Sequence, residues 1–199
     1  IYNSSLPEIV DINGVSFQKL DLRDEKEINL FIEKNRSVLK NISLIHSAGT
    51  SEDNLAINHK LDKWTNVLEL NLTANFLLTK ALLPIMIKQK WGRIIHFSSI
   101  RVAPGTISYT ATKQGLLGMS EVLAKEYAKF NITSNSLILG AFNTGMFRDL
   151  NEKVKKDMIN QIPSKKIGEV ENIVRAVKFL VDSPFVTGAS IRIDGGASI

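Results

Sequence analysis

GRIIHFSSIRVAPGTISYTATK, residues 92–113, decides the fold class of this 199-residue chain. Its first eight residues form a mostly apolar run that predicts a buried strand ending in the hydroxyl groups of Ser98 and Ser99. The Pro104-Gly105 pair predicts a turn, and a helix that carries Tyr109 and Lys113 follows it. A strand, a turn and a helix in this order indicate an α/β fold with a mostly parallel sheet.

The same alternation continues through the rest of the chain. Short β-branched runs alternate with longer amphipathic runs, which is typical of a doubly wound sheet flanked by helices on both faces. The strands are predicted at residues 15–22, 42–46, 94–99, 132–140 and 190–194. The helices are predicted at residues 24–39, 61–88, 108–129 and 169–181.

Local signals refine two of these helices. Asp24, with Glu27 three residues later, predicts a capping box at the start of the first helix. Pro84 is expected to end or kink the long helix over residues 61–88. The inward face of that long helix is predicted to contain Trp64, Leu68, Asn71, Phe76 and Leu83.

Composition limits the class of protein. A chain of 199 residues with 44% hydrophobic residues is long enough for one domain with a substantial core. The net charge of +5 is spread among acidic residues, and there is no cysteine, so nucleic-acid binding, disulfides and thiolate metal sites are not expected. No signal-peptide pattern or apolar run of 18 residues is visible, which favours a cytoplasmic protein without a membrane span.

Tyr109 and Lys113 lie four residues apart on a predicted helix, so their side chains share one face. An ammonium group beside a phenol favours the ionised phenol and makes it a stronger acid. One unit charge about 4 Å away is worth roughly 4 kcal/mol at an effective dielectric constant near 20. Ser99 would lie at the carboxyl end of its strand, where open α/β sheets bind ligands. The pattern therefore predicts a site that protonates a carbonyl oxygen during hydride transfer.

These residues resemble the short-chain dehydrogenase/reductase family, and the motifs appear in the family's order along nearly the whole chain. The resemblance implies one Rossmann-like catalytic domain over residues 1–199. It implies that Ser99 orients the substrate, that Tyr109 is the acid/base, and that Lys113 acidifies Tyr109 and hydrogen-bonds the nicotinamide ribose. Asn71 stands where the family has a helix asparagine that holds a water molecule in a proton relay.

The resemblance also implies a nicotinamide cofactor. The segment from His46 to Gly49 stands where the family has Asn-Asn-Ala-Gly, with both asparagine positions changed. Leu139 replaces a family proline before the segment that would contact the carboxamide. Besides Tyr109 and Lys113, the implied cofactor-binding residues are Asp21, Leu22, Ser47, Ala48, Gly49, Gly140, Phe142 and Thr144. The segment Tyr2-Asn3-Ser4-Ser5 contains no acid to bind the adenosine ribose hydroxyls, which favours NADP(H) over NAD(H).

Two segments near the predicted site bear on the substrate. The spacing from Ser99 to Tyr109 is shorter than is usual in the family, so residues 100–108 are expected to form a trimmed lip that admits a different or bulkier substrate. The polar stretch 144–166, which contains Met146, Phe147 and Met158, is expected to be a mobile substrate lid. An ordinary surface helix is the alternative for that stretch.

The start of the chain differs from a complete dinucleotide-binding domain. Such a domain opens with a strand, a glycine-rich turn and a helix, whereas the twelve glycines here form no phosphate-binding cluster. Gly115 and Gly118 are better explained by close helix packing. We therefore expect about 30 further residues before Ile1 in the natural protein, and weak or no cofactor binding by the 199-residue chain alone.

The expected function is that of an NAD(P)-dependent oxidoreductase that interconverts a carbonyl and an alcohol. The substrate classes implied by the resemblance are a 3-oxoacyl thioester, a sugar and a small polyol. A non-catalytic relative that serves as a binding or scaffold subunit is the alternative. A homo-oligomer, a dimer or a tetramer, is expected through the two long helices. His46, His59 and His96 lack metal-ligand spacing, so no metal site is predicted.

Overall fold

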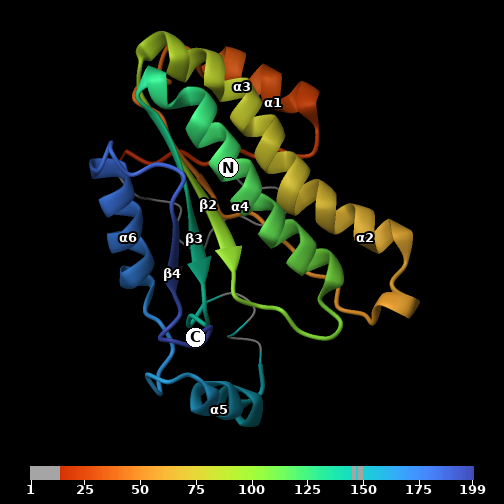
Figure 1. The fold of residues 1–199 in the computed structure, drawn as a ribbon. Helices are drawn as coiled ribbons and strands as arrows, with labels where there is room; N and C mark the ends of the chain where they lie inside the picture. Colours follow the sequence, from red (N-terminus) through yellow and green to blue (C-terminus); the bar gives the residue numbers. More distant parts are fainter. Residues whose placement is uncertain (1–13, 145–146, 148–149) are drawn as a thin grey trace.

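The computed structural model describes residues 14–144, 147 and 150–199, and its centre is a four-stranded parallel sheet (Figure 1). The strands lie in the sheet in the same order as in the chain. They are β1 (Ser43–His46), β2 (Gly92–Ser99), β3 (Ile132–Leu139) and β4 (Ser190–Ile193). All three pairings are parallel, so the carboxyl ends of the strands meet at one edge of the sheet. The predicted α/β class with a parallel sheet is confirmed.

Helices cover both faces of the sheet (Figure 1). One face carries α1 (Glu25–Asn35), α2 (Leu61–Leu68), α3 (Ala74–Gln89) and α4 (Ile107–Tyr127), and the other carries α6 (Val170–Asp182). The helix α5 (Glu152–Gln161) lies beyond the carboxyl ends of the strands. Three short helical segments complete the described elements: η1 (Ala56–Asn58), η2 (Glu69–Thr73) and η3 (Ala128–Phe130).

Two apolar clusters hold these layers together. The larger one contains Ile28 of α1, Met86 of α3 and Ile94 of β2, all of which are completely buried. The smaller one joins Ile95 of β2 to Leu180 of α6 on the opposite face. Since neighbouring residues of β2 point to opposite faces, one strand contributes to both clusters.

The predicted strand at residues 15–22 is wrong. Only Lys19 in this segment forms a β-bridge, although Leu20 is buried against the larger cluster. A run with high β-propensity becomes a strand only beside another strand, because its backbone groups need partners. Within the described part of the chain, β1 is an edge strand of the sheet and pairs with β2 alone.

The start of α1 is only partly as predicted. The Asp24 side chain accepts hydrogen bonds from the backbone N–H groups of Lys26 and Glu27, as an N-cap should. The Glu27 carboxylate, however, accepts from the backbone N–H of Asp21 rather than of Asp24. The hydrogen bond from Glu27 back to Asp24 that would complete the capping box is therefore replaced by a bond to the preceding turn. At its other end, α1 stops at Asn35 rather than near residue 39.

The long helix runs from Leu61 to Gln89 as α2, η2 and α3 in succession. Pro84 lies inside α3 and does not end it. The inward face is predicted correctly for Asn71 and Leu83, whereas Phe76 is 51% exposed. By length and composition this helix could cross a membrane, contrary to the expectation from the sequence. Half of its most apolar window is buried within the protein, as in the core helix of a globular domain.

Candidate active site

Tyr109 and Lys113 lie side by side in the first turns of α4. Both residues are only 8% exposed, and the Lys113 Nζ atom is 5.6 Å from the centroid of the Tyr109 ring. Lys113 Nζ also donates a hydrogen bond of 2.8 Å to the backbone carbonyl of Phe97 in β2. Burial lowers the pKa of Lys113 to about 8, so the amine is still mostly protonated at neutral pH. The structure thus brings a buried ammonium group beside the phenol.

Ser99 is the last residue of β2, two residues after Phe97, whose carbonyl accepts the hydrogen bond from Lys113. Its Oγ atom accepts a hydrogen bond of 3.1 Å from the backbone N–H of Arg101, which leaves the hydroxyl proton available to donate to a ligand. The neighbouring Ser98 Oγ donates 2.7 Å to the backbone carbonyl of Lys113. Ser98 therefore joins the end of β2 directly to α4, whereas Ser99 is bonded to the loop that follows β2.

Asn71 is fully buried in η2, a π-helical turn in the middle of the long helix. Its Oδ1 atom accepts from the backbone N–H of Thr50 at 2.8 Å, and its Nδ2 group donates to the Thr50 carbonyl at 2.9 Å and to Thr112 Oγ1 at 3.2 Å. Because the amide is fully hydrogen-bonded, its burial is tolerated. Asn71 therefore fixes the loop after β1 against the helix α4.

Gly49 lies between the predicted catalytic residues. A Cβ atom at this position would be 3.3 Å from Asn71 Oδ1 and 3.6 Å from Lys113 Nζ. Ser47, Ala48 and Gly49 are exposed at the carboxyl end of β1. The structure therefore keeps an open backbone surface beside the ammonium group, which suits close approach of a ligand.

The other predicted cofactor residues form two groups. At the end of β3, a Cβ on Gly140 would be 2.7 Å from the Asp194 Cα atom, so packing also requires glycine there. Phe142 is buried and bridges to Gly168, whereas Thr144 is exposed.

Asp21 and Leu22 precede α1. Asp21 forms an ion pair of 2.8 Å with Arg23, and hydrogen bonds from Arg23 lower the pKa of the Asp21 carboxyl group. Leu22 packs against the larger apolar cluster.

The predicted lid is only partly described. Phe147 is buried, and Met158 lies on α5 with 36% exposure, whereas Met146 lies outside the described residues. Tyr2-Asn3-Ser4-Ser5, on which the cofactor preference rests, also lies outside them. The described part of the stretch after Thr144 contains a surface helix at the sheet edge where the predicted site lies (Figure 1).

His46 and His96 form a buried pair that the sequence did not reveal. Their rings stack with a centroid separation of 5.1 Å because the two residues are register partners in β1 and β2. His46 Nε2 lies 3.0 Å from Thr79 Oγ1. Burial, together with the nearby charge of Lys113, lowers the pKa of both histidines, to about 4 for His96. Both rings are therefore neutral at physiological pH.

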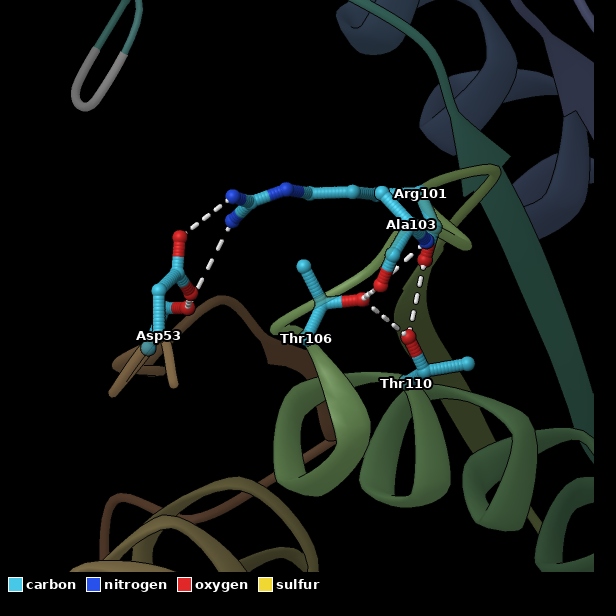
Figure 2. Close-up of polar contacts among 6 residues, drawn as sticks. Asp53, Arg101, Ala103, Thr106 and Thr110 are labelled. Carbon is cyan, nitrogen blue, oxygen red and sulfur yellow. Dashed lines mark hydrogen bonds and ion pairs between the residues drawn. The ribbon is translucent and has the colours of Figure 1, made fainter. Parts of the chain in front are cut away.

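The loop between Ser99 and Tyr109 supplies further polar side chains that the sequence analysis missed (Figure 2). Arg101 forms an ion pair of 2.5 Å with Asp53, from the loop after β1. Burial raises the pKa of Asp53, but hydrogen bonds from Ser51 and Arg101 outweigh it and lower the pKa overall. Thr106 Oγ1 and Thr110 Oγ1 lie 2.9 Å apart beneath the Arg101 side chain.

Comparisons with known proteins bear on the family of this chain. A family model described as enoyl-(acyl carrier protein) reductase matches residues 3–198. The chain is 35% identical over 197 residues to the 3-oxoacyl-acyl-carrier-protein reductase of Aquifex aeolicus, covering 95% of this chain and 79% of the relative. It is 33% identical over 198 residues to the Escherichia coli enzyme of the same name, with coverages of 96% and 81%.

A solved structure shares the fold. The crystal structure of a protein from Agrobacterium tumefaciens, taken to be a gluconate dehydrogenase, superposes with a TM-score of 0.85. The two sequences are 24% identical, and the match covers 90% of this chain and 74% of the other. At that identity the likeness supports the architecture, and the chemistry has to be argued from the site itself.

Proposed function

Since the chain belongs to the short-chain dehydrogenase/reductase family, and is on that ground an NAD(P)-dependent oxidoreductase, we propose that Ser99, Tyr109, Lys113 and Asn71 carry its chemistry. The reaction is the interconversion of a carbonyl and an alcohol. One observation carries the proposal: a buried ammonium group lies beside a buried phenol, at the end of a strand whose last hydroxyl proton is free to donate.

The residues fit a nicotinamide cofactor. Gly49 leaves an open space against Lys113 Nζ and Asn71 Oδ1 that any Cβ atom would narrow. Ala48 and Gly49 would hold the cofactor at the end of β1, Gly140 and Phe142 at the end of β3, and Asp21 near the adenine. When bound, the nicotinamide supplies or accepts the hydride. We propose NADP(H) over NAD(H), because Tyr2-Asn3-Ser4-Ser5 contains no acid that would repel a 2′-phosphate.

The chain's own residues handle the proton and the developing charge. The Ser99 hydroxyl donates to the carbonyl oxygen of the substrate and fixes its orientation. The Tyr109 phenol gives its proton to the same oxygen during reduction. The Lys113 ammonium stabilises the phenolate that results, since it lies 5.6 Å from the ring centroid in a mostly dry site. Asn71 holds the backbone around Thr50 in place and borders the path by which Tyr109 regains its proton.

The test uses the full-length protein encoded by the gene. NADPH and NADH are titrated separately while the fluorescence of the nicotinamide is followed, and turnover is measured with a panel of carbonyl substrates. Tyr109→Phe is expected to abolish turnover and to leave cofactor binding unchanged. Tyr127→Phe, at the other end of the same helix, is the matched control and should retain wild-type turnover. Near-normal turnover in Tyr109→Phe would remove Tyr109 from the mechanism.

A non-catalytic binding or scaffold subunit is not favoured, because the family relationship is to reductases, and the Lys113 ammonium group beside the Tyr109 ring supports a catalytic site. That alternative makes a separate prediction. A full-length protein that bound neither NADPH nor NADH would support it and would contradict the oxidoreductase proposal.

We propose that the protein assembles as a homo-oligomer, a dimer or a tetramer, and acts in the cytoplasm. An apolar groove runs between α3 and α4 and is lined by Phe76, Leu83, Met119 and Leu123. The large Phe76 side chain is half exposed, and a Cβ atom on Gly118 of α4 would meet only open space. Sedimentation analysis of wild-type protein and Phe76→Glu tests this: a strict monomer at micromolar concentration for wild type would contradict it.

A further inference from the structure

The Arg101 side chain extends across the first turn of α4 toward the loop after β1 (Figure 2). Its Cζ atom lies 5.8 Å from the centroid of the Tyr109 ring. Its Nη2 atom pairs with Asp53 Oδ2 at 2.5 Å, and its Nη1 atom lies 3.4 Å from Ser51 Oγ. A charged pair thus borders the space in which a carbonyl substrate must lie to reach Tyr109 and Ser99.

The backbone of this loop is fixed on both sides. Thr110 Oγ1 donates to the Arg101 carbonyl at 3.1 Å, and the Arg101 N–H donates to Ser99 Oγ. On the other side, the Asn54 N–H donates to the Gly105 carbonyl at 2.8 Å. The guanidinium group is therefore held near the site before any substrate binds, so less side-chain entropy is lost on binding.

Stability does not explain this ion pair. The side chains of Arg101 and Asp53 are 39% and 49% exposed, and exposed pairs typically contribute between about 0 and 1 kcal/mol. The loop is already held by hydrogen bonds to its backbone that do not involve the two charged side chains. The pair is therefore not needed to hold the loop, and its two side chains beside Tyr109 are free to contact a ligand.

The chemistry of the pair limits the kind of ligand. Together the two groups carry no net charge, and they offer both N–H donors and carboxylate acceptors. Hydroxyl groups match such a surface because each can donate and accept. An apolar acyl chain laid against the pair would remove two charges from water without compensation. An anionic substituent would meet the negative charge of Asp53.

We propose that Arg101 and Asp53 form the substrate-recognition pair of this site, and that the substrate is a ketone or aldehyde with neighbouring hydroxyl groups, as in a sugar or polyol. The inference rests on the oxidoreductase function proposed above. It assigns the choice among the expected substrate classes to two residues of this chain, and the class differs from the acyl-carrier-protein substrate named for the relatives. Arg101 contacts the hydroxyl groups as donor, and Asp53 both accepts from them and holds Arg101 in place.

The test compares substrates that differ only in the relevant groups. Full-length protein is assayed with NADPH and four compounds: erythrulose, 2-butanone, acetoacetate and acetoacetyl-N-acetylcysteamine. Erythrulose has the four-carbon skeleton of 2-butanone with three added hydroxyl groups. Its kcat/KM should exceed that of 2-butanone on the order of 100-fold, a modest preference for a hydrogen-bonding site. The acid and the thioester should be poorer substrates than erythrulose.

Two variants then test whether Arg101 and Asp53 cause the preference for erythrulose. Arg101→Gln and Asp53→Asn should each reduce the erythrulose preference by about tenfold, mainly through KM, with little change in kcat for 2-butanone. Lys63→Gln breaks a comparable ion pair to Glu52 in the same loop region and should leave the preference unchanged. Nicotinamide fluorescence and thermal melts of each variant check that cofactor binding and folding are retained.

The possible failures are distinguishable. If the kcat/KM of wild type for the thioester, the acid or 2-butanone equals or exceeds that for erythrulose, or if Arg101→Gln keeps the full preference, the recognition pair is overturned while the oxidoreductase function stands. If the full-length protein binds cofactor but reduces none of the four compounds, the proposed substrate class is overturned; if it binds neither NADPH nor NADH, the oxidoreductase proposal is contradicted and this inference falls with it.

Discussion

Replacing the buried Lys113 by methionine is expected to make the protein more stable and inactive. Burial lowers the pKa of Lys113 from 10.5 to about 8. One pKa unit corresponds to about 1.4 kcal/mol, so keeping this amine protonated at pH 7 costs the folded state roughly 3 kcal/mol. Methionine has a similar length and no charge. It leaves the Phe97 carbonyl without the Lys113 donor, which costs about 1 kcal/mol.

The net expectation for Lys113→Met is a gain of about 2 kcal/mol in the free energy of unfolding at pH 7. For a chain of this size the gain corresponds to about 4–8 °C in Tm. This gain in stability should disappear at alkaline pH. The direction of the change with pH follows from the number of protons that the folded and unfolded states bind. Between pH 8 and 10.5 the unfolded lysine holds its proton while the folded one has lost it, so wild-type stability rises with pH there.

Urea unfolding followed by circular dichroism at pH 7 and pH 9.5 measures both effects. Wild type should gain roughly 2 kcal/mol relative to Lys113→Met between the two pH values. Lys125→Met, on an exposed position of the same helix, controls for the loss of a lysine charge and should track wild type at both pH values. The reasoning is refuted if Lys113→Met is less stable than wild type at pH 7, or if the difference is the same at pH 9.5.

Three further predictions test neighbouring features. Gly49→Ala places a methyl group 3.3 Å from Asn71 Oδ1, so turnover should fall on the order of tenfold with an unchanged circular dichroism spectrum; normal turnover would contradict the tight fit. Burial keeps folded His96 unprotonated, so His96 alone should cost wild type about 3 kcal/mol of stability as the pH falls from 6.5 to 4; in melts over this range His96→Asn should lose about 3 kcal/mol less than wild type, because only the buried His46 still opposes protonation. Thr110→Val removes the donor to the Arg101 carbonyl and should lower kcat by several-fold for every substrate; a loss confined to one substrate in steady-state assays would assign Thr110 to recognition instead.

The sequence predicted contacts that are local along the chain. Tyr109 and Lys113 share a helix, so a spacing of four residues suffices to place them together. Ser99 could be placed at the carboxyl end of the sheet because a buried apolar run ends there. The burial of Asn71 followed from its position in an apolar helix, although the π-helical turn around it was not predicted.

Contacts between distant segments could not be predicted in the same way. His46 and His96 stack only because β1 and β2 pair in a particular register, which neither run specifies alone. Asp53 and Arg101 are 48 residues apart and meet where two loops leave neighbouring strands. The strand expected at residues 15–22 failed for the related reason that a strand depends on its neighbour as much as on its own side chains.

The short loop after β2 gives one residue two tasks. The backbone N–H of Arg101 fixes the Ser99 hydroxyl, while its guanidinium group lies beside the Tyr109 ring. A longer loop would allow these tasks to be divided between residues that vary independently. With the roles proposed for Ser99 and Arg101, any insertion between Ser99 and Tyr109 would shift both the oxygen that orients the carbonyl and the charge that contacts the rest of the substrate. The proposal therefore couples substrate range to catalytic geometry, and side-chain substitutions such as Arg101→Gln can separate them because they leave the backbone bond in place.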